Sequence, residues 1–208
     1  MDPRRASRGT WLLALVTYPA LFLLAAAIHV LLGGASPTWQ GAQSLVQGPG
    51  AFLSGLTIVL LLGPVSAEVG WRGYALDLLD ARMHPLAATL LLGVAWWAWH
   101  LPLFFMEGTL HGGGGLVSAF AVGFLVTVLA YSVGFSWLVH RSRSSILIAV
   151  AAHASINGTL GWAAPFDTNV FVVATVLVAV LAAVTVGRDR RLRLPLRAGG
   201  RSVEGPVG

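Results

Sequence analysis

Six long apolar runs constrain the fold of this 208-residue chain more than any other feature. A membrane-spanning helix needs about 20 predominantly apolar residues, and each run is close to that length or longer. Only 10% of the residues are charged, whereas a soluble domain has about 25%. We therefore expect an all-α, polytopic transmembrane helical bundle of about six spans. The runs are Trp11 to Leu32, Ala51 to Asp80, Pro85 to Met106, Leu116 to Val139, Ile146 to Ala163 and Val170 to Val186.

The rest of the chain divides around this bundle. We expect residues 1–10 to form a cytoplasmic N-terminus and residues 11–186 to form the transmembrane bundle. Residues 187–208 are basic and then glycine-rich, which predicts a disordered cytoplasmic tail. The first apolar run is longer than the apolar core of a cleavable signal peptide, which has about 7–15 residues, so an uncleaved first helix is expected.

The positive charges lie on one side of the expected bundle. All 13 basic residues are arginines. Three lie in the N-terminus, Arg72 and Arg82 lie towards the end of the second run and in the connection after it, two lie between the fourth and fifth runs, and six lie in the tail. Loops 34–50, 107–115 and 164–169 contain none. Positive charge resists translocation, so the arginine-bearing side is predicted to be cytoplasmic, with both termini there and a multi-pass location in the plasma membrane.

The basic composition has an alternative interpretation, because a pI near 11 is also typical of nucleic-acid-binding proteins. A mean hydropathy of +0.78 argues against it. We therefore expect the chain to lie in the lipid bilayer and to bind no nucleic acid. The absence of cysteine excludes disulfides and thiol chemistry.

Polar clusters occur within three of the runs, where ionisable groups are costly and mark function or a buried pair. Glu68 and Arg72 lie on the second run, His100 on the third, and His153 with Asn157 on the fifth. At 1.5 Å per residue they lie about 18, 22 and 12 Å from the cytoplasmic ends of their helices. They can therefore meet at one depth, provided that the second helix continues past Pro64 to about Asp80.

Each cluster also has a structural interpretation. Glu68 and Arg72 are four residues apart and could neutralise each other. His100 follows three tryptophans and could belong to an interfacial aromatic belt. His153 and Asn157 could form hydrogen bonds between helices. A carboxylate, two imidazoles and an amide together would instead suit water activation and peptide hydrolysis.

These motifs resemble those of the CPBP family of intramembrane glutamic endopeptidases, the CAAX-protease and bacteriocin-processing group related to Rce1. Its three motifs are Glu-Glu-x-x-x-Arg, an aromatic residue four before a histidine, and His-x-x-x-Asn. The stretch Gly63-Pro64 followed by Gly70 to Tyr74 fits the first motif, Trp96 to His100 fits the second and His153 to Asn157 fits the third. The resemblance therefore covers about residues 51–163. It implies a CAAX-protease-like core and an endopeptidase that cleaves a membrane-associated protein or peptide.

The resemblance also implies roles for individual residues. His100 would help to activate water, His153 and Asn157 would support the oxyanion, and Arg72 would hold a carboxylate in place. The second motif glutamate is Glu68, but the first, usually the catalytic base, is replaced by Ala67. Three explanations fit this departure: a natural pseudoprotease, an introduced inactivating substitution, or a variant site in which Glu68 turns inward.

Two rival functions follow from the same residues. The first is a non-catalytic membrane partner or a bacteriocin-immunity factor that kept the fold and binds a peptide. The second is a zinc metalloprotease, since two histidines and a carboxylate could bind zinc. The resemblance favours a site without a metal or other cofactor. The substrate and whether it is prenylated, the oligomeric state and the physiological role are not specified by the sequence.

Overall fold

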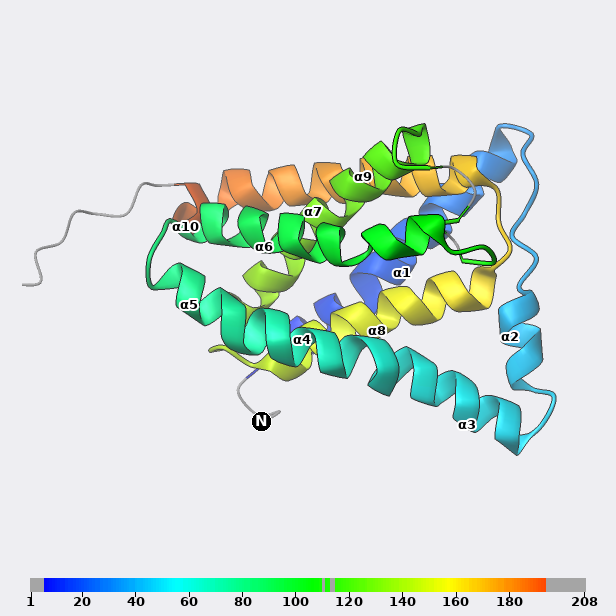
Figure 1. The fold of residues 1–208 in the computed structure, drawn as a ribbon, viewed down its shortest axis with the longest axis horizontal. Helices are drawn as coiled ribbons and strands as arrows, with labels where there is room; N and C mark the ends of the chain where they lie inside the picture. Colours follow the sequence, from blue (N-terminus) through cyan, green and yellow to red (C-terminus); the bar gives the residue numbers. More distant parts are fainter. Residues whose placement is uncertain (1–5, 110, 113–114, 194–208) are drawn as a thin grey trace, which may run out of the picture.

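The expected spans are present as helices in the computed structural model, which describes residues 6–109, 111–112 and 115–193. No strand occurs in that part of the chain. The predicted all-α membrane bundle is therefore confirmed (Figure 1). The helices long and apolar enough to cross a membrane are Arg8–Leu31, Pro49–Asp80, Pro85–Phe105, Ala119–Arg141, Ile146–Ala163 and Thr168–Arg188.

Several spans consist of more than one labelled element. In chain order the elements are α1 (Arg8–Leu31), α2 (Gln40–Leu45), α3 (Pro49–Thr57), η2 (Ile58–Val65), α4 (Ser66–Gly70), η3 (Trp71–Ala75), α5 (Leu76–Asp80), α6 (Pro85–Trp99), η4 (Leu101–Phe105), α7 (Ala119–Arg141), α8 (Ile146–Ala163), α9 (Thr168–Arg188) and α10 (Arg190–Arg193).

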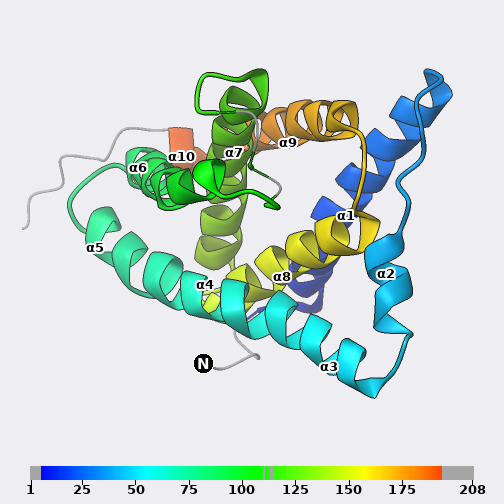
Figure 2. The ribbon, with the colours of Figure 1, turned by 45° about the vertical axis from the view of Figure 1, so that its right-hand side comes forward.

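The second span is helical from Pro49 to Asp80 without a break, as the sequence predicts (Figure 2). Two of its segments, η2 and η3, are π-helical, and η2 contains Pro64. A proline removes one backbone donor and crowds the preceding turn, and a wider π turn accommodates that loss without ending the helix. The span is mostly exposed, and its first part, α3, contacts α2 and η2.

The other spans pack more closely. Helix α7 lies against α6 and α9, while α1 lies against α8 and α9, and α8 also contacts η2. Tyr18 of α1 and Phe135 of α7 meet edge to face, with ring centroids 5.5 Å apart, within the larger of the two core clusters of the described residues. Small residues permit this packing: a Cβ on Gly134 would collide with the Tyr18 hydroxyl.

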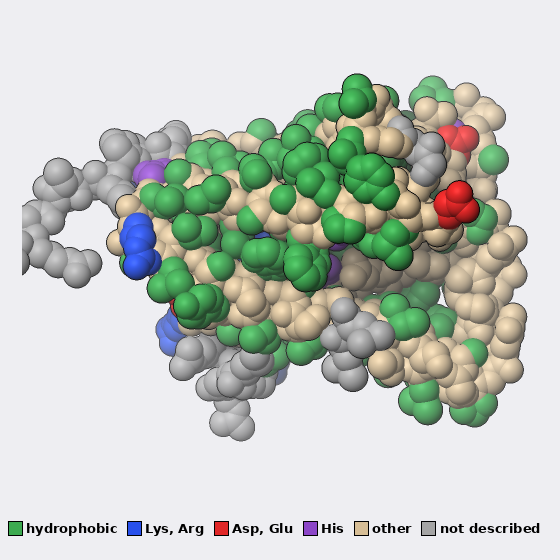
Figure 3. Space-filling model, viewed as in Figure 1, with side chains coloured by type: hydrophobic (Ala, Val, Ile, Leu, Met, Phe, Trp, Pro, Cys, Tyr) green, Lys and Arg blue, Asp and Glu red, His purple; other side chains and the backbone are tan. Residues whose placement is uncertain are grey.

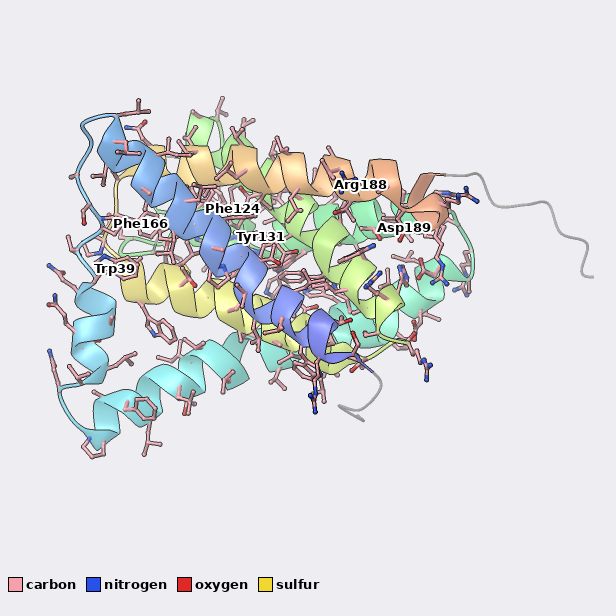
Figure 4. All side chains as sticks on the ribbon, turned by 180° about the vertical axis from the view of Figure 1, so that it is seen from behind. Trp39, Phe124, Tyr131, Phe166, Arg188 and Asp189 are labelled. Carbon is pink, nitrogen blue, oxygen red and sulfur yellow. The ribbon has the colours of Figure 1, made fainter. Side chains whose placement is uncertain are left out.

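The two ends of the bundle differ. Helix α2 and the connection between α8 and α9 lie at one end, where Trp39 donates its backbone N–H to Ala163 at 3.4 Å. Arg188 and Asp189 lie at the other end, opposite Trp39 and Phe166 (Figure 4). On the face drawn in Figure 3, the most prominent arginine side chains gather at one end of the molecule. Acidic side chains occur at both ends, since Asp167 precedes α9 and Asp189 follows it. The arginines, and not the acidic residues, therefore distinguish the two ends.

Candidate active site

Glu68 and Arg72 form a buried ion pair on the second span. Arg72 Nη1 donates to Glu68 Oε1 at 3.1 Å, and both side chains are fully buried. The second nitrogen, Nη2, donates to Ser132 Oγ at 3.2 Å, and that hydroxyl in turn donates to the Thr89 carbonyl at 2.8 Å. A buried charge requires a partner and hydrogen bonds. Arg72 obtains them from its own helix and from α7.

Two aromatic rings complete the enclosure of Arg72. Its guanidinium carbon lies 4.8 Å from the Trp96 ring centroid and 5.2 Å from that of Phe135. Cation–π contacts of this kind strengthen when the site is desolvated. The guanidinium is therefore held from three helices and fixes the Glu68 carboxylate in turn.

His153 of α8 shares the same carboxylate. Its Nδ1 donates to Glu68 Oε1 at 2.8 Å. The ring packs against Trp96, with centroids 5.1 Å apart, and against Phe135 at 5.8 Å. Because Nδ1 is engaged by Glu68, Nε2 is the nitrogen left for a ligand. It accepts a hydrogen bond when the ring is neutral and donates one when the ring is protonated.

His100 lies at the junction of α6 and η4. Helix α6 ends at Trp99, and Pro102 occupies the first turn of η4, where its missing N–H is tolerated. His100 Nδ1 donates to the Trp96 carbonyl at 2.8 Å. This bond fixes the neutral tautomer with its lone pair on Nε2. The ring thus has one anchored nitrogen and one nitrogen free to act as a base.

A cavity of about 590 Å³ lies beside these side chains. Its polar residues include His100, His153 and Asn157, and Trp96 forms part of its wall. At its margin Trp99 and Tyr74 are 73% and 68% exposed. A pocket with a few converging polar groups within apolar walls is the usual form of a ligand site.

Ala67 also lines this cavity, whereas Glu68 does not. Adjacent helical residues point about 100° apart, so the methyl group of Ala67 faces the cavity while the carboxylate of Glu68 points to Arg72 and His153. An inward-turned Glu68, one of the three explanations above, is not the arrangement found. The lining residues described for this cavity include no carboxylate.

A second cavity, of about 350 Å³, adjoins the first and shares Trp96, His100, His153 and Asn157 with it. Its far wall is apolar and includes Phe124 and Tyr131, which point into the interior of the bundle (Figure 4). Close approach of η2 to α8 depends on Gly63, since an added Cβ would lie 3.2 Å from the Asn157 amide nitrogen.

The structure brings together all the residues singled out in the sequence. Glu68, Arg72 and His153 are in direct contact, and His100, Asn157 and Ala67 line the adjacent cavity. His29, a further histidine of the first span, lies elsewhere, with its Nε2 3.8 Å from Asp167 Oδ2. Among the described residues, no three histidine or acidic side chains are grouped so as to hold a metal ion.

Two side chains of this region were not anticipated. Ser132 holds Arg72 from α7, and His111 lines the second cavity from the loop before α7. A serine in an apolar helix is a weak signal, because membrane helices contain many that serve only packing. A histidine among glycines gives no spacing from which its neighbours could be predicted.

Comparison with known proteins identifies the protein class. Residues 49–159, more than half of the chain, match the model of the Rce1-like type II CAAX prenyl endopeptidases. The chain is also similar to a protein named CAAX prenyl protease 2 from Methanococcus maripaludis, with 32% identity over 152 residues. That alignment covers 70% of this chain and 56% of the relative.

The chain belongs to the Rce1-like endopeptidase family. The matched segment runs from the start of α3 into α8, so it includes every lining residue of the cavity of about 590 Å³ and every residue of the ion-paired cluster. Most of the lining of the second cavity also falls within it, except Leu160, Gly161 and Phe171. Helices α1 and α9 lie outside it and supply packing around the site. The resemblance read from the three motifs is thereby confirmed at the level of the family.

Proposed function

We propose that this chain is an intramembrane endopeptidase that cleaves a membrane-associated protein or peptide in the cavity of about 590 Å³, with His100 as its water-activating base. The observation that carries the proposal is the orientation of His100. Its Nδ1 is anchored on the Trp96 carbonyl, so Nε2 is free for a water molecule in the cavity. A base held in one tautomer is the first requirement for general-base catalysis.

The proposed hydrolysis runs in two steps. His100 Nε2 accepts a proton from water as the water oxygen bonds to the peptide carbonyl carbon. The oxyanion receives hydrogen bonds from the Asn157 amide and from a protonated His153, whose positive charge Glu68 stabilises. The C–N bond then breaks, and the imidazolium of His100 returns its proton to the leaving amine. The products are a carboxylic acid and an amine.

Ala67 limits the rate of this reaction. A general base contributes about 10²–10⁴-fold to catalysis, and a methyl group at this position supplies neither base nor hydrogen bond. His100 must therefore act without the carboxylate that the family motif places beside it. We expect turnover to be slow for this reason.

The presence of Ala67 favours a second candidate function. The chain would then be a non-catalytic membrane partner that binds a peptide in the cavity, as an immunity-type factor would. Ala67 lines the cavity, and the Glu68 carboxylate is bound to Arg72 and His153. The site therefore resembles that of an endopeptidase that lacks the carboxylate of its first motif glutamate. In that case the two histidines have no catalytic role. Substituting His100 or His153 would then leave peptide binding and any cellular phenotype unchanged.

The name of the similar archaeal protein supplies a first substrate to test. A C-a-a-X sequence is prenylated on its cysteine, so we propose prenylated C-a-a-X peptides as one substrate class and unmodified membrane-anchored peptides as the other. We further propose a plasma-membrane location with the arginine-bearing end in the cytoplasm.

The direct test uses the purified chain in lipid vesicles. The probes are a farnesylated C-a-a-X peptide and its unprenylated counterpart, each with a fluorophore before the cysteine and a quencher at the end. We expect slow cleavage that His100→Ala and His153→Ala abolish and that His29→Gln leaves unchanged. Peptide binding without cleavage, equal in all variants, would favour the non-catalytic partner.

A further inference from the structure

His111 is an ionisable side chain that the proposed mechanism does not use. It belongs to the loop between η4 and α7, and its ring is enclosed by three phenylalanines. The ring centroids of His111 and Phe124 are 4.5 Å apart and nearly perpendicular, and Phe104 and Phe120 lie at 5.3 and 6.0 Å. Three aromatic contacts hold the imidazole in one place.

The position of this ring relates it to the proposed base. The centroid of His111 lies 5.7 Å from that of His100, and both residues line the cavity of about 350 Å³. A hydrogen bond to nitrogen spans about 2.7–3.2 Å. Two rings with centroids at this separation are close enough for one water molecule to hydrogen-bond to a nitrogen of each.

The polar atom of His111 also requires a partner. Its Nε2 is shielded from solvent and has no hydrogen-bond partner in the part of the chain that the structure describes. Leaving a buried polar atom unpaired costs about 1–3 kcal/mol. An atom held in this state beside a cavity and a second imidazole is suited to bind a molecule that enters the cavity.

We infer that His111 is a further catalytic residue, which holds the attacking water together with His100. This inference rests on the proposed hydrolysis. His100 Nε2 takes one proton of the water as the oxygen attacks, and His111 Nε2 accepts a hydrogen bond from the other. The proton on His100 passes to the leaving amine, and His111 is unchanged at the end of the cycle. Two imidazoles would thus position the water in a site that lacks the carboxylate at residue 67.

The first experiment needs no substrate. The full chain, with its histidines labelled with ¹⁵N, is reconstituted in vesicles, and the Nε2 signals of His100 and His111 are assigned by their loss in His100→Gln and His111→Phe. We expect both nitrogens to report hydrogen bonds to water, and the His100 signal to shift in His111→Phe but not in the control His29→Phe. An unchanged His100 signal in His111→Phe would overturn the inference.

The second experiment measures catalysis with the farnesylated C-a-a-X peptide. His111→Phe preserves the aromatic packing and removes the nitrogen, so we expect kcat to fall about tenfold with KM unchanged, the equivalent of one hydrogen bond. His111→Gln, which keeps a hydrogen-bonding group, should recover part of the loss. Equal kcat in the unsubstituted chain and both variants would refute a catalytic role.

The two experiments separate the two proposals. If the peptide is not cleaved by the unsubstituted chain or by Ala67→Glu, the proposed hydrolysis fails, while the ¹⁵N signals still decide whether His111 and His100 share a water. If the peptide is cleaved and the His111 variants keep the full kcat, whereas His100→Ala and His153→Ala lose it, the proposed hydrolysis stands and the role of His111 is wrong.

Discussion

At the scale of single residues, the most consequential interaction is the sharing of one carboxylate oxygen. Glu68 Oε1 accepts from Arg72 at 3.1 Å and from His153 at 2.8 Å. The carboxylate therefore balances a permanent charge and orients a histidine of the cavity. It contacts a residue of the cavity through His153 and does not line the cavity itself.

This sharing predicts a non-additive effect on stability. Removing one member of a buried ion pair costs about 3–5 kcal/mol, because the other charge is left unpaired. Arg72→Met should lower the free energy of unfolding by that amount. Glu68→Gln combined with Arg72→Met should recover most of it, since glutamine still accepts from His153.

Unfolding of the single and double variants in mixed detergent micelles measures both effects. Losses that simply add in the double variant would contradict a mutually dependent pair.

His111 gives a second prediction at this scale, in the pH dependence of stability. Burial, and to a smaller extent the charge of His100, lowers the pKa of His111 from 6.5 to about 4. The other groups packed on it are the phenylalanines of η4 and α7. Between pH 6.5 and 4 the unfolded chain binds a proton that the folded chain does not. The contribution of the neutral His111 ring to the free energy of unfolding is therefore complete above pH 6.5 and is lost as the pH falls towards 4.

Thermal unfolding at several pH values tests this sign. The Tm of the unsubstituted chain should fall more steeply between pH 6.5 and 4 than the Tm of His111→Phe. Parallel curves would show that His111 is not buried in its neutral form.

The sequence identified which residues meet but not how they are oriented. Spacing placed Glu68, His100 and His153 at reconcilable depths, and they do share one region. The direction of the Glu68 carboxylate depends on Ser132, Trp96 and Phe135, which belong to other helices. No local pattern contains that information.

At the scale of elements, the close packing of α6 and α7 keeps this cluster assembled. Ser132 of α7 donates to the Thr89 carbonyl of α6, and Gly93 lies one turn further along α6. A Cβ on Gly93 would come within 2.9 Å of Leu129 Cδ2 and 3.0 Å of Ser132 Cβ. The glycine therefore sets how closely the two helices approach.

Gly93→Ala should force these helices apart, weaken the bond between Ser132 and Arg72 and destabilise the fold. Overpacking typically costs about 1–3 kcal/mol. Gly187→Ala is the matched control, because nothing lies within 4 Å of its added Cβ in α9. The control should be neutral or slightly stabilised. Equal unfolding free energies for the two variants would show that α6 and α7 adjust without cost.

The continuity of the second span was predictable, because a proline is tolerated within a membrane helix. Its two π-helical segments were not. They arise where Pro64 and Gly63 meet α8 and where Arg72 reaches α7, and these are contacts between distant parts of the chain. Helix periodicity alone assumes regular turns.

At the scale of the whole molecule, the positions of the arginines predict the orientation in the membrane. Arg82 lies in the turn before α6, and Glu107 lies at the opposite end of that span. Both side chains are exposed, and the sequence contains no cysteine. Single cysteines at these two positions therefore report the topology without background.

In intact cells, a membrane-impermeant maleimide should label Glu107→Cys and leave Arg82→Cys unlabelled until the cells are lysed. The reverse pattern would invert the predicted topology and place the arginine-bearing end outside.

Six spans and their boundaries were readable from hydropathy because the bilayer imposes a length on each helix. The arrangement of the spans was not, since lipid-facing and core-facing surfaces of these helices are equally apolar. Tyr18, Phe135 and Gly134 show the difference: their packing depends on shape rather than polarity.

The most direct test of the central claim is the effect of restoring a carboxylate at residue 67. Ala67 lines the cavity with His100, so Ala67→Glu should cleave the farnesylated C-a-a-X peptide about 10²–10⁴-fold faster than the unsubstituted chain. Ala67→Gln, of the same size but without a base, should show no such gain. Equal rates for all three chains, with cleavage intact, would contradict the account.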